Sequence, residues 1–232
     1  MTPIGNDIVD LGERHTRTKS RDARFLARVF TPHERAAIEK SADPDTILWA
    51  LWAGKEASYK AASKLQPQQR LSSAPARYEV DISDVAGFLM TGMVMSPLGQ
   101  FSLNITVTAM YVHAVASRTS PPSAAVIKSA VSTMLPDGGC DESAQVRKDL
   151  CRDLGAFLSV NPQELEFIRP GPPNRLGPPE VQWLGHPLDI DITMSHHGRF
   201  IAYAFAPMRK RRQISLAKSH SIYDCLAENR SI

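Results

Sequence analysis

The sequence predicts an α+β protein that contains two similar units. Several segments show apolar residues at helical spacing, and two others alternate apolar and polar residues as β-hairpins do. The two hairpin segments also resemble each other: NITVTAM and YVHAVA (Asn104 to Ala116) parallel DITMSHHGR and FIAYAFA (Asp191 to Ala206). This likeness favours a duplicated α+β unit, although alternation is common to all hairpins.

In the first half, a short strand is expected at Ile4 to Leu11, entered through Gly5. Helical spacing follows from Arg21 to Phe30. A second helix begins after Thr31, because Pro32 at its first position and Glu34 three residues after Thr31 form the capping-box pattern. The remaining elements are a helix from Asp43 to Lys64, a polar loop at Gln66 to Ala76, and strands at Arg77 to Ser83 and Gln100 to Ser117.

The second half begins after the run TSPPS at residues 119–123, which is the best candidate for a linker. A helix or strand is expected at Ala124 to Leu135, a helix at Ser143 to Leu158, and an extended or turning segment at Pro170 to Pro179. A hairpin covers Asp189 to Ala206, with its tip near His197 and Gly198. Residues 209–232 form a basic tail. The expected units are therefore residues 1–118 and 124–208.

The composition excludes several classes of protein. With 232 residues, 43% hydrophobic and 22% charged, the chain has enough apolar material for a core, so disorder of the whole chain is excluded. A net charge of +3, spread over both halves, argues against a nucleic-acid-binding domain. The three cysteines lack the spacing of a zinc site or disulfide framework. No apolar stretch approaches the roughly 20 residues that span a bilayer, and the acidic N-terminus has no signal peptide, so we expect a cytoplasmic protein.

Two carboxylates are candidates for chemistry. Asp7 lies in an apolar strand, where a charge is costly unless a cation or several donors meet it; the plain alternative is a cap on the next turn. Glu56 lies between Trp52 and Lys60 at helical spacing, with Tyr59 beside it. The plain alternative here is a surface pair with Lys60, but the aromatic neighbours favour a partly buried carboxylate.

A third candidate is the tip of the later hairpin. The segment SHHGR, from Ser195 to Arg199, gathers four polar or charged side chains where a hairpin would present them together. Histidine and arginine suit phosphate oxygens. A solvated loop is the plain alternative, and a metal site lacks the usual spacing of helical zinc ligands.

These motifs together resemble the 4'-phosphopantetheinyl transferases. The matching segments, in order, are GNDIVDL, FLARVFTPHE, WAGKEASYK and SHHGRF. Their order is that of the short holo-acyl-carrier-protein synthase branch, but the chain is about twice as long as is typical of that branch. Its second half, from Gln145 through GPPEV to the S-H hairpin, resembles the opening half of the surfactin-synthetase-type transferases, and its front half resembles their closing half. The resemblance implies a pseudo-dimer of two α+β units in circularly permuted order, with the active site at their interface.

The resemblance also implies roles for the residues. Asp7 and Glu56 would hold Mg²⁺, with Glu56 and Lys60 as the catalytic pair. Coenzyme A would contact Lys60, Ser195, His196 and Arg199. The chain departs from the family pattern at three places. Val9 replaces a second acid, and the usual glycines are absent after Lys60. Pro178 replaces a lysine, whose phosphate contact would fall to Arg175 or Arg169.

A basic strip offers a surface for a protein substrate. Residues 14–28 contain six basic side chains against Asp22 alone, and Arg14, Arg21, Arg24 and Arg28 are the docking candidates. Carrier proteins are acidic, so such a strip would steer and orient them, although a solvated helix face is the usual meaning of a charge run.

The implied function is Mg²⁺-dependent transfer of 4'-phosphopantetheine from coenzyme A to a serine of an apo acyl or peptidyl carrier protein, which releases adenosine 3',5'-bisphosphate. Because one chain holds both units, a monomer is expected. The alternatives are a relative that binds a carrier protein or coenzyme A without catalysis, and a nucleic-acid-binding protein that uses the basic tail at Arg209 to Arg212.

Overall fold

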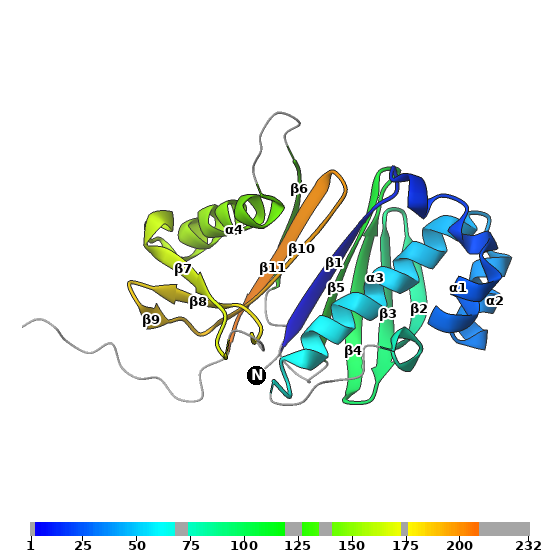
Figure 1. Ribbon diagram of the computed structural model, residues 1–232, viewed down its shortest axis with the longest axis horizontal. Coiled ribbons are helices and arrows are strands. Elements are labelled where there is room, and N and C mark those ends of the chain that lie inside the picture. The colour runs from blue at the N-terminus through cyan, green and yellow to red at the C-terminus, as the bar shows by residue number, and fades with distance from the viewer. Residues whose placement is uncertain (1–2, 68–73, 119–126, 135–140, 173–175, 209–232) are drawn as a thin grey trace, which may run out of the picture.

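The computed structural model describes residues 3–67, 74–118, 127–134, 141–172 and 176–208, and within them the chain has an α+β fold with several sheets (Figure 1). The largest sheet has five strands in the order β1-β5-β4-β3-β2, and all of its neighbouring strands are antiparallel. Its strands are β1 (Ile4–Asp10), β2 (Glu79–Ala86), β3 (Leu89–Ser96), β4 (Gly99–Val107) and β5 (Tyr111–Arg118).

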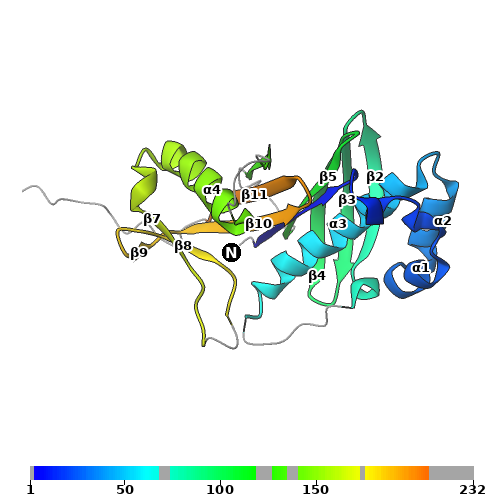
Figure 2. The ribbon, with the colours of Figure 1, turned by 45° about the horizontal axis from the view of Figure 1, so that its top comes forward.

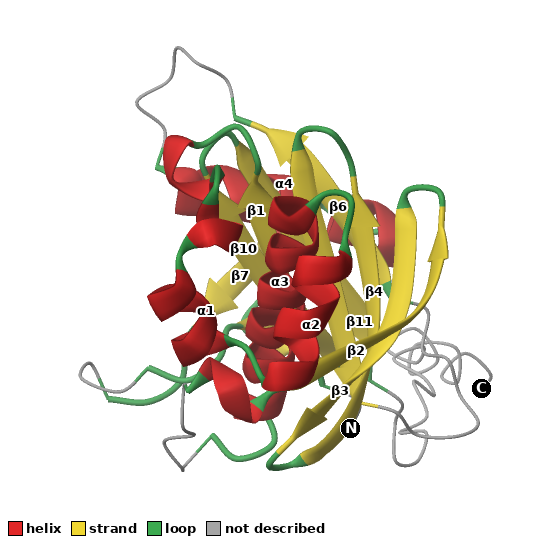
Figure 3. Ribbon diagram, turned by 90° about the vertical axis from the view of Figure 1, so that its right-hand side faces the viewer, coloured by secondary structure: helices red, strands yellow, loops and turns green. Residues whose placement is uncertain are grey.

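One face of this sheet is covered by helices (Figure 3). They are α1 (Ala23–Val29), α2 (Pro32–Lys40) and the long α3 (Pro44–Ser63). Short 3₁₀ turns occupy Arg14–Thr16, Lys19–Arg21 and Pro75–Arg77. The capping box that the sequence predicts for α2 is present, since the Thr31 side chain accepts from the Glu34 N–H and the Glu34 carboxylate accepts from the Thr31 N–H.

The rest of the described chain forms two three-stranded sheets and one long helix. The first sheet has the order β10-β11-β6 and the second the order β7-β8-β9. The elements are β6 (Lys128–Thr133), α4 (Glu142–Leu158), a 3₁₀ turn at Pro162–Glu164, β7 (Leu165–Ile168), β8 (Glu180–Trp183), β9 (His186–Pro187), β10 (Ile190–His197) and β11 (Phe200–Pro207).

Two large apolar clusters lie on either side of β1. One fills the space between α3 and the five-stranded sheet, and the other lies between α4 and strands β10 and β11. Smaller clusters join the two parts, with Ile4 against Ala204 and Ala206, and Ile8 against Phe200 and Ala202. Figure 2 shows β1 running between α3 and the β10–β11 hairpin. Strand β1 therefore belongs to the contact between the two parts.

Most predicted elements are present, with three differences. The predicted helix at Arg21 to Phe30 is shorter in the structure, because α1 spans Ala23–Val29 and Arg21 belongs to the preceding 3₁₀ turn. Strand β3 and the β7-β8-β9 sheet were not predicted. The segment Ala124 to Leu135, left open between helix and strand, contains β6. The candidate linker at 119–123 and the tail at 209–232 lie outside the described residues. No helix of the described chain is long and apolar enough to cross a membrane.

Candidate active site

Helix α3 lies directly on strand β1. Strand alternation turns Gly5, Asp7 and Val9 toward the helix, and Val9 packs into the core beneath it. A Cβ atom at Gly5 would overlap the Ala57 carbonyl oxygen and approach the Ala61 nitrogen to 2.7 Å. The glycine at the entry of the strand therefore permits the close approach that brings Asp7 to the helix.

Asp7 meets Lys60 at this contact. The Lys60 Nζ donates to Asp7 Oδ1 and to the Asn6 carbonyl oxygen, each at 2.9 Å. The Asp7 side chain is 16% exposed and that of Lys60 is 32% exposed, so the pair lies at the edge of the core, open to solvent on one side. The strand carboxylate and the helix lysine, 53 residues apart in sequence, are thus in direct contact.

Glu56 lies one turn before Lys60 on α3 and is half-buried. Burial raises its pKa, and the negative charge of Asp7 raises it further, while Lys60 opposes both effects. Burial also raises the pKa of Asp7, again opposed by Lys60. Among the described residues, Glu56 makes no hydrogen bond or ion pair. The site therefore holds two partly desolvated carboxylates that repel each other, one of them without a partner.

Such a pair fits a divalent cation. Carboxylate oxygens are the ligands that Mg²⁺ prefers, and Mg²⁺ keeps several waters where the protein supplies only one or two carboxylates. Within the described chain, no group of three or more His, Cys, Asp or Glu side chains has the arrangement of a metal site. Val9, which stands where the family pattern has a further acid, is 2% exposed in the core. Asp7 and Glu56 are thus the two residues that would hold the ion.

Strand β10 seals the free edge of β1 with side chains. The N–H groups of Ile4, Asn6 and Asp10 donate to Asp191 Oδ2 (2.7 Å), Thr193 Oγ1 (3.1 Å) and His197 Nδ1 (2.9 Å), at alternate positions of β10. These bonds satisfy edge donors that would otherwise pair with another strand. Lys64 adds a cation at the Ile4 end, where its Nζ donates to Asp191 Oδ1 at 2.7 Å.

The prediction that the hairpin tip presents Ser195 and His196 together is wrong. Both belong to β10, where successive side chains point to opposite faces. Ser195 is 5% exposed and its Oγ accepts from Asn6 Nδ2 at 2.9 Å. His196 is exposed on the other face, where its Nδ1 lies 2.6 Å from Glu142 Oε2 at the start of α4.

A histidine behind the site was missed by the sequence analysis. His113 of β5 is 4% exposed, and its Nε2 lies 3.3 Å from Asn6 Nδ2. Burial and the nearby Lys60 lower the pKa of His113 to about 4. The ring is therefore neutral near pH 7 and does not add a second positive charge beside Lys60.

His196 lines a small cavity between α4, β7 and β10. The cavity measures about 130 Å³, and its cationic lining residues are Arg147 of α4 and Arg169 after β7, with Pro179 and Met194 among its other walls. A space this small holds a phosphate-sized group rather than a whole drug-sized ligand. Neither arginine makes an ion pair within the described residues, so both are available to an anion.

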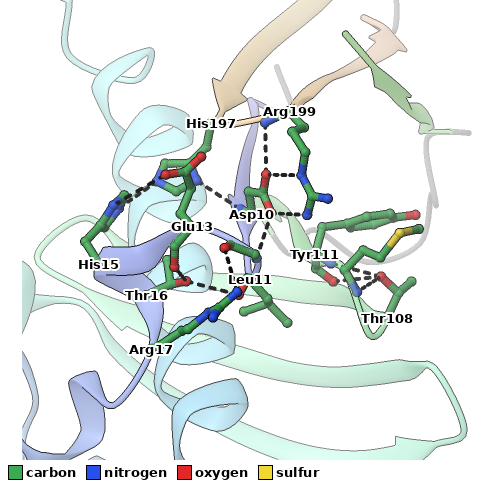
Figure 4. A network of polar contacts seen from close by, with 12 residues as sticks. Asp10, Leu11, Glu13, His15, Thr16, Arg17, Thr108, Tyr111, His197 and Arg199 are labelled. Atoms are coloured by element: carbon green, nitrogen blue, oxygen red, sulfur yellow. Dashed lines mark hydrogen bonds and ion pairs between the residues drawn. The ribbon is translucent and has the colours of Figure 1, made fainter. Parts of the chain in front are cut away.

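Arg199 and His197 bind Asp10 at the end of β1 (Figure 4). The Arg199 Nε and Nη2 donate to the two Asp10 carboxylate oxygens at 2.9 and 2.7 Å. These bonds lower the pKa of Asp10. The guanidinium predicted to contact coenzyme A is therefore engaged by a carboxylate of the protein itself. The polar residues at alternate positions from Asp191 to His197 are the sequence pattern that could have predicted the contact of β10 with β1.

The predicted docking residues Arg14, Arg21, Arg24 and Arg28 are all exposed, on the 3₁₀ turns after β1 and on α1. None of the four forms an ion pair within the described chain. Arg175 lies outside the described residues.

An α+β fold with an acidic pair and a lysine at a strand–helix contact is consistent with the predicted class. A model of the 4'-phosphopantetheinyl transferase superfamily matches residues 3–96, which confirms the resemblance. The matched part carries Asp7, Glu56 and Lys60. No curated protein sequence matches the chain.

Proposed function

We propose that the protein transfers 4'-phosphopantetheine from coenzyme A to a serine of an apo acyl or peptidyl carrier protein, with Mg²⁺, and releases adenosine 3',5'-bisphosphate. The observation that carries this proposal is the contact of α3 with β1. It brings Asp7, Glu56 and Lys60 together within the segment that matches the superfamily.

Each part of the site has a task in this reaction. The serine oxygen attacks the phosphorus that bears the pantetheine, and the bond from that phosphorus to the bridging oxygen breaks. Glu56 takes the serine proton as the general base. Lys60 binds a diphosphate oxygen. Asp7 and Glu56 would hold Mg²⁺, which would supply positive charge to the diphosphate oxygens.

The small cavity supplies the nucleotide end of this site in the proposal. His196, Arg147 and Arg169 present cationic or hydrogen-bonding groups to one phosphate-sized space. Adenosine 3',5'-bisphosphate carries two phosphates, and arginine pairs with phosphate through two parallel bonds. Because β10 borders both this cavity and β1, one strand links the nucleotide end to the acidic pair.

Strand order supports the pseudo-dimer with a site at its interface. The order β1-β5-β4 in one sheet corresponds to β6-β11-β10 in the other. When the two similar hairpins are aligned, Ala114 corresponds to Tyr203; Ala114 pairs with Asp7, and Tyr203 pairs with Ala130. An alanine thus stands where the first unit has its strand carboxylate, and this favours one active site per chain. Because one chain holds both units, we expect a monomer.

The direct test is a carrier-modification assay. Purified protein, coenzyme A, Mg²⁺ and an apo carrier protein are mixed, and the carrier is weighed by mass spectrometry. The proposal expects the carrier to gain one phosphopantetheinyl group. Binding of the carrier or coenzyme A with no gain in mass would instead identify a non-catalytic relative. Salt-sensitive binding of nucleic acid without transfer would identify a nucleic-acid-binding protein.

Charge reversal in the basic strip should weaken carrier docking. We expect the double variant Arg21→Glu, Arg24→Glu to raise the KM for the carrier protein by about tenfold or more, because steering by exposed charges is lost. The effect should shrink as salt is added. Steady-state kinetics with varied carrier concentration measures it. The control is Arg118→Glu, because Arg118 is an exposed arginine at the end of β5, outside the basic strip. Equal effects of both substitutions would contradict this docking surface.

A further inference from the structure

The carboxylate of Asp10 is the most heavily bonded acidic group at the contact of β1 with the β10–β11 hairpin. It is fully buried and accepts four hydrogen bonds. The donors are Gly12 N (2.8 Å), Arg199 N (2.9 Å), Arg199 Nε (2.9 Å) and Arg199 Nη2 (2.7 Å). Three of the four come from one residue of the hairpin, which is a bidentate pair strengthened by a backbone bond.

His197 completes the contact from the other side of the turn. The Asp10 N–H donates to its Nδ1 at 2.9 Å, so the neutral ring carries its proton on Nε2. That Nε2–H points at His15 Nε2, 3.1 Å away, in the loop after β1 (Figure 4). A metal ion between these two nitrogens would need the opposite tautomer of His197. The histidine pair is therefore a hydrogen-bonded link between the hairpin and the loop that carries Arg14 and Arg17.

The turn between His197 and Arg199 is shaped to receive Asp10. Gly198 has a φ of 55°, which a side chain rarely adopts, and a Cβ atom there would lie 2.6 Å from Asp10 Oδ2. Glycine thus serves both the backbone conformation and the approach of the carboxylate. Together, Asp10, His197 and Arg199 form what we call the strand clamp.

The strand clamp lies close in sequence to two residues of the proposed site, Asp7 and His196. Asp7 precedes Asp10 by three residues on β1, and His196 precedes Arg199 by three residues across the hairpin turn. Side-chain bonds hold β1 to β10, whereas in the described chain the backbone ladders of these strands join β1 to β5 and β10 to β11. A slip of one residue between β1 and β10 would move Asp7 relative to His196 by about 3.3 Å. A misplacement of about 1 Å can cost about 10²-fold in rate.

We propose that Asp10 and Arg199 are positioning residues, which fix the register of β1 against β10 and so hold the acidic pair at its working distance from the cavity lined by His196. This inference rests on the proposed function. It assigns Arg199 to the protein's own carboxylate, without a contact to the coenzyme A phosphates.

The test compares Asp10→Asn with the wild-type protein in the carrier-modification reaction. We expect kcat to fall by about tenfold or more, because the two halves of the site lose register. The KM for the carrier should stay nearly unchanged, since the basic strip is intact. Binding of adenosine 3',5'-bisphosphate, measured by calorimetry, should also persist with full stoichiometry, which shows that the second part remains folded.

A double-mutant cycle separates positioning from loss of stability. If Asp10 acts through Arg199, the variant Asp10→Asn, Arg199→Gln should lower kcat no further than Asp10→Asn alone. Asp191→Asn is the matched control, because Asp191 also binds β1 from β10 but at the far end, next to Lys64. It should reduce stability with a smaller loss of kcat than Asp10→Asn.

Each outcome is decisive. Normal kcat in Asp10→Asn, with an active wild type, would overturn the positioning role and leave the proposed function standing. A wild type that never modifies the carrier would refute the proposed function itself, and the positioning role with it. If Asp10→Asn does not fold, Arg199→Lys decides, because it keeps the charge and loses the bidentate geometry; an unchanged kcat there would overturn the inference.

Discussion

Glu56→Gln is expected to lower kcat for carrier modification by about 10²–10⁴-fold, because in the proposed reaction an amide would neither accept the serine proton nor offer a charged ligand to Mg²⁺. The fold should persist. Glu56 makes no hydrogen bond among the described residues, and the substitution removes a charge that burial already disfavours. We therefore expect the melting temperature to stay the same or rise slightly.

Asp7→Ala should lower kcat to a similar extent. Single-turnover kinetics at saturating coenzyme A and carrier measures both variants, and circular dichroism checks their fold. Glu39→Gln is the matched control, an exposed glutamate on α2 outside the site. Near-normal activity of either Glu56→Gln or Asp7→Ala would refute the assignment of the acidic pair.

Lys55→Met is expected to lower the free energy of unfolding by roughly 3–5 kcal/mol, since it leaves a buried charge without its partner. Lys55 neighbours Glu56 in the same motif but points away from the site, into the core. Its side chain is 1% exposed, and its Nζ lies 2.6 Å from Glu34 Oε1 and 2.6 Å from the Tyr78 carbonyl oxygen. Burial lowers the pKa of Lys55, and Glu34 opposes that effect.

Urea unfolding measures this loss. The double variant Lys55→Met, Glu34→Leu should recover part of the stability, because apolar groups often replace a buried ion pair without loss. Lys40→Met, at the exposed end of α2, is the control. A loss below about 1 kcal/mol in Lys55→Met would match an exposed pair and contradict this account. Among folded molecules kcat should persist, which separates the structural lysine from Lys60.

Local signals predicted helix α2 and helix α3, which carries Glu56. These signals are the capping box at Thr31, the proline after Asp43, and the helical spacing of Trp52, Glu56 and Lys60. Each depends on residues within a few helical turns of one another, and the structure has helices at these positions. Strand β3 was missed because its sequence, LMTGMVMS, holds a glycine and three methionines, which are weak strand signals. Its pairing with β2 and β4 makes it a strand.

The hairpin tip shows a different limit. The sequence placed SHHGR at a turn, and Gly198 does turn the chain with a positive φ. Whether Ser195, His196 and Arg199 act together depends on where β10 ends. Because the strand extends through His197, Ser195 faces β1 and His196 faces the cavity by α4.

From its own pattern, the sequence determined an α+β chain, the two similar hairpins, the helix that presents Glu56 beside Lys60, and the resemblance to the transferase superfamily. Only the tertiary structure decided that Asp7 contacts Lys60, that Lys55 is buried with Glu34, and that Arg199 is bound to Asp10. The physical reason is distance along the chain. Helix caps and spacing act between residues a few positions apart, whereas these pairs join residues 53, 21 and 189 positions apart. They form only when β1 packs against α3 and β10, and when α2 packs against α3.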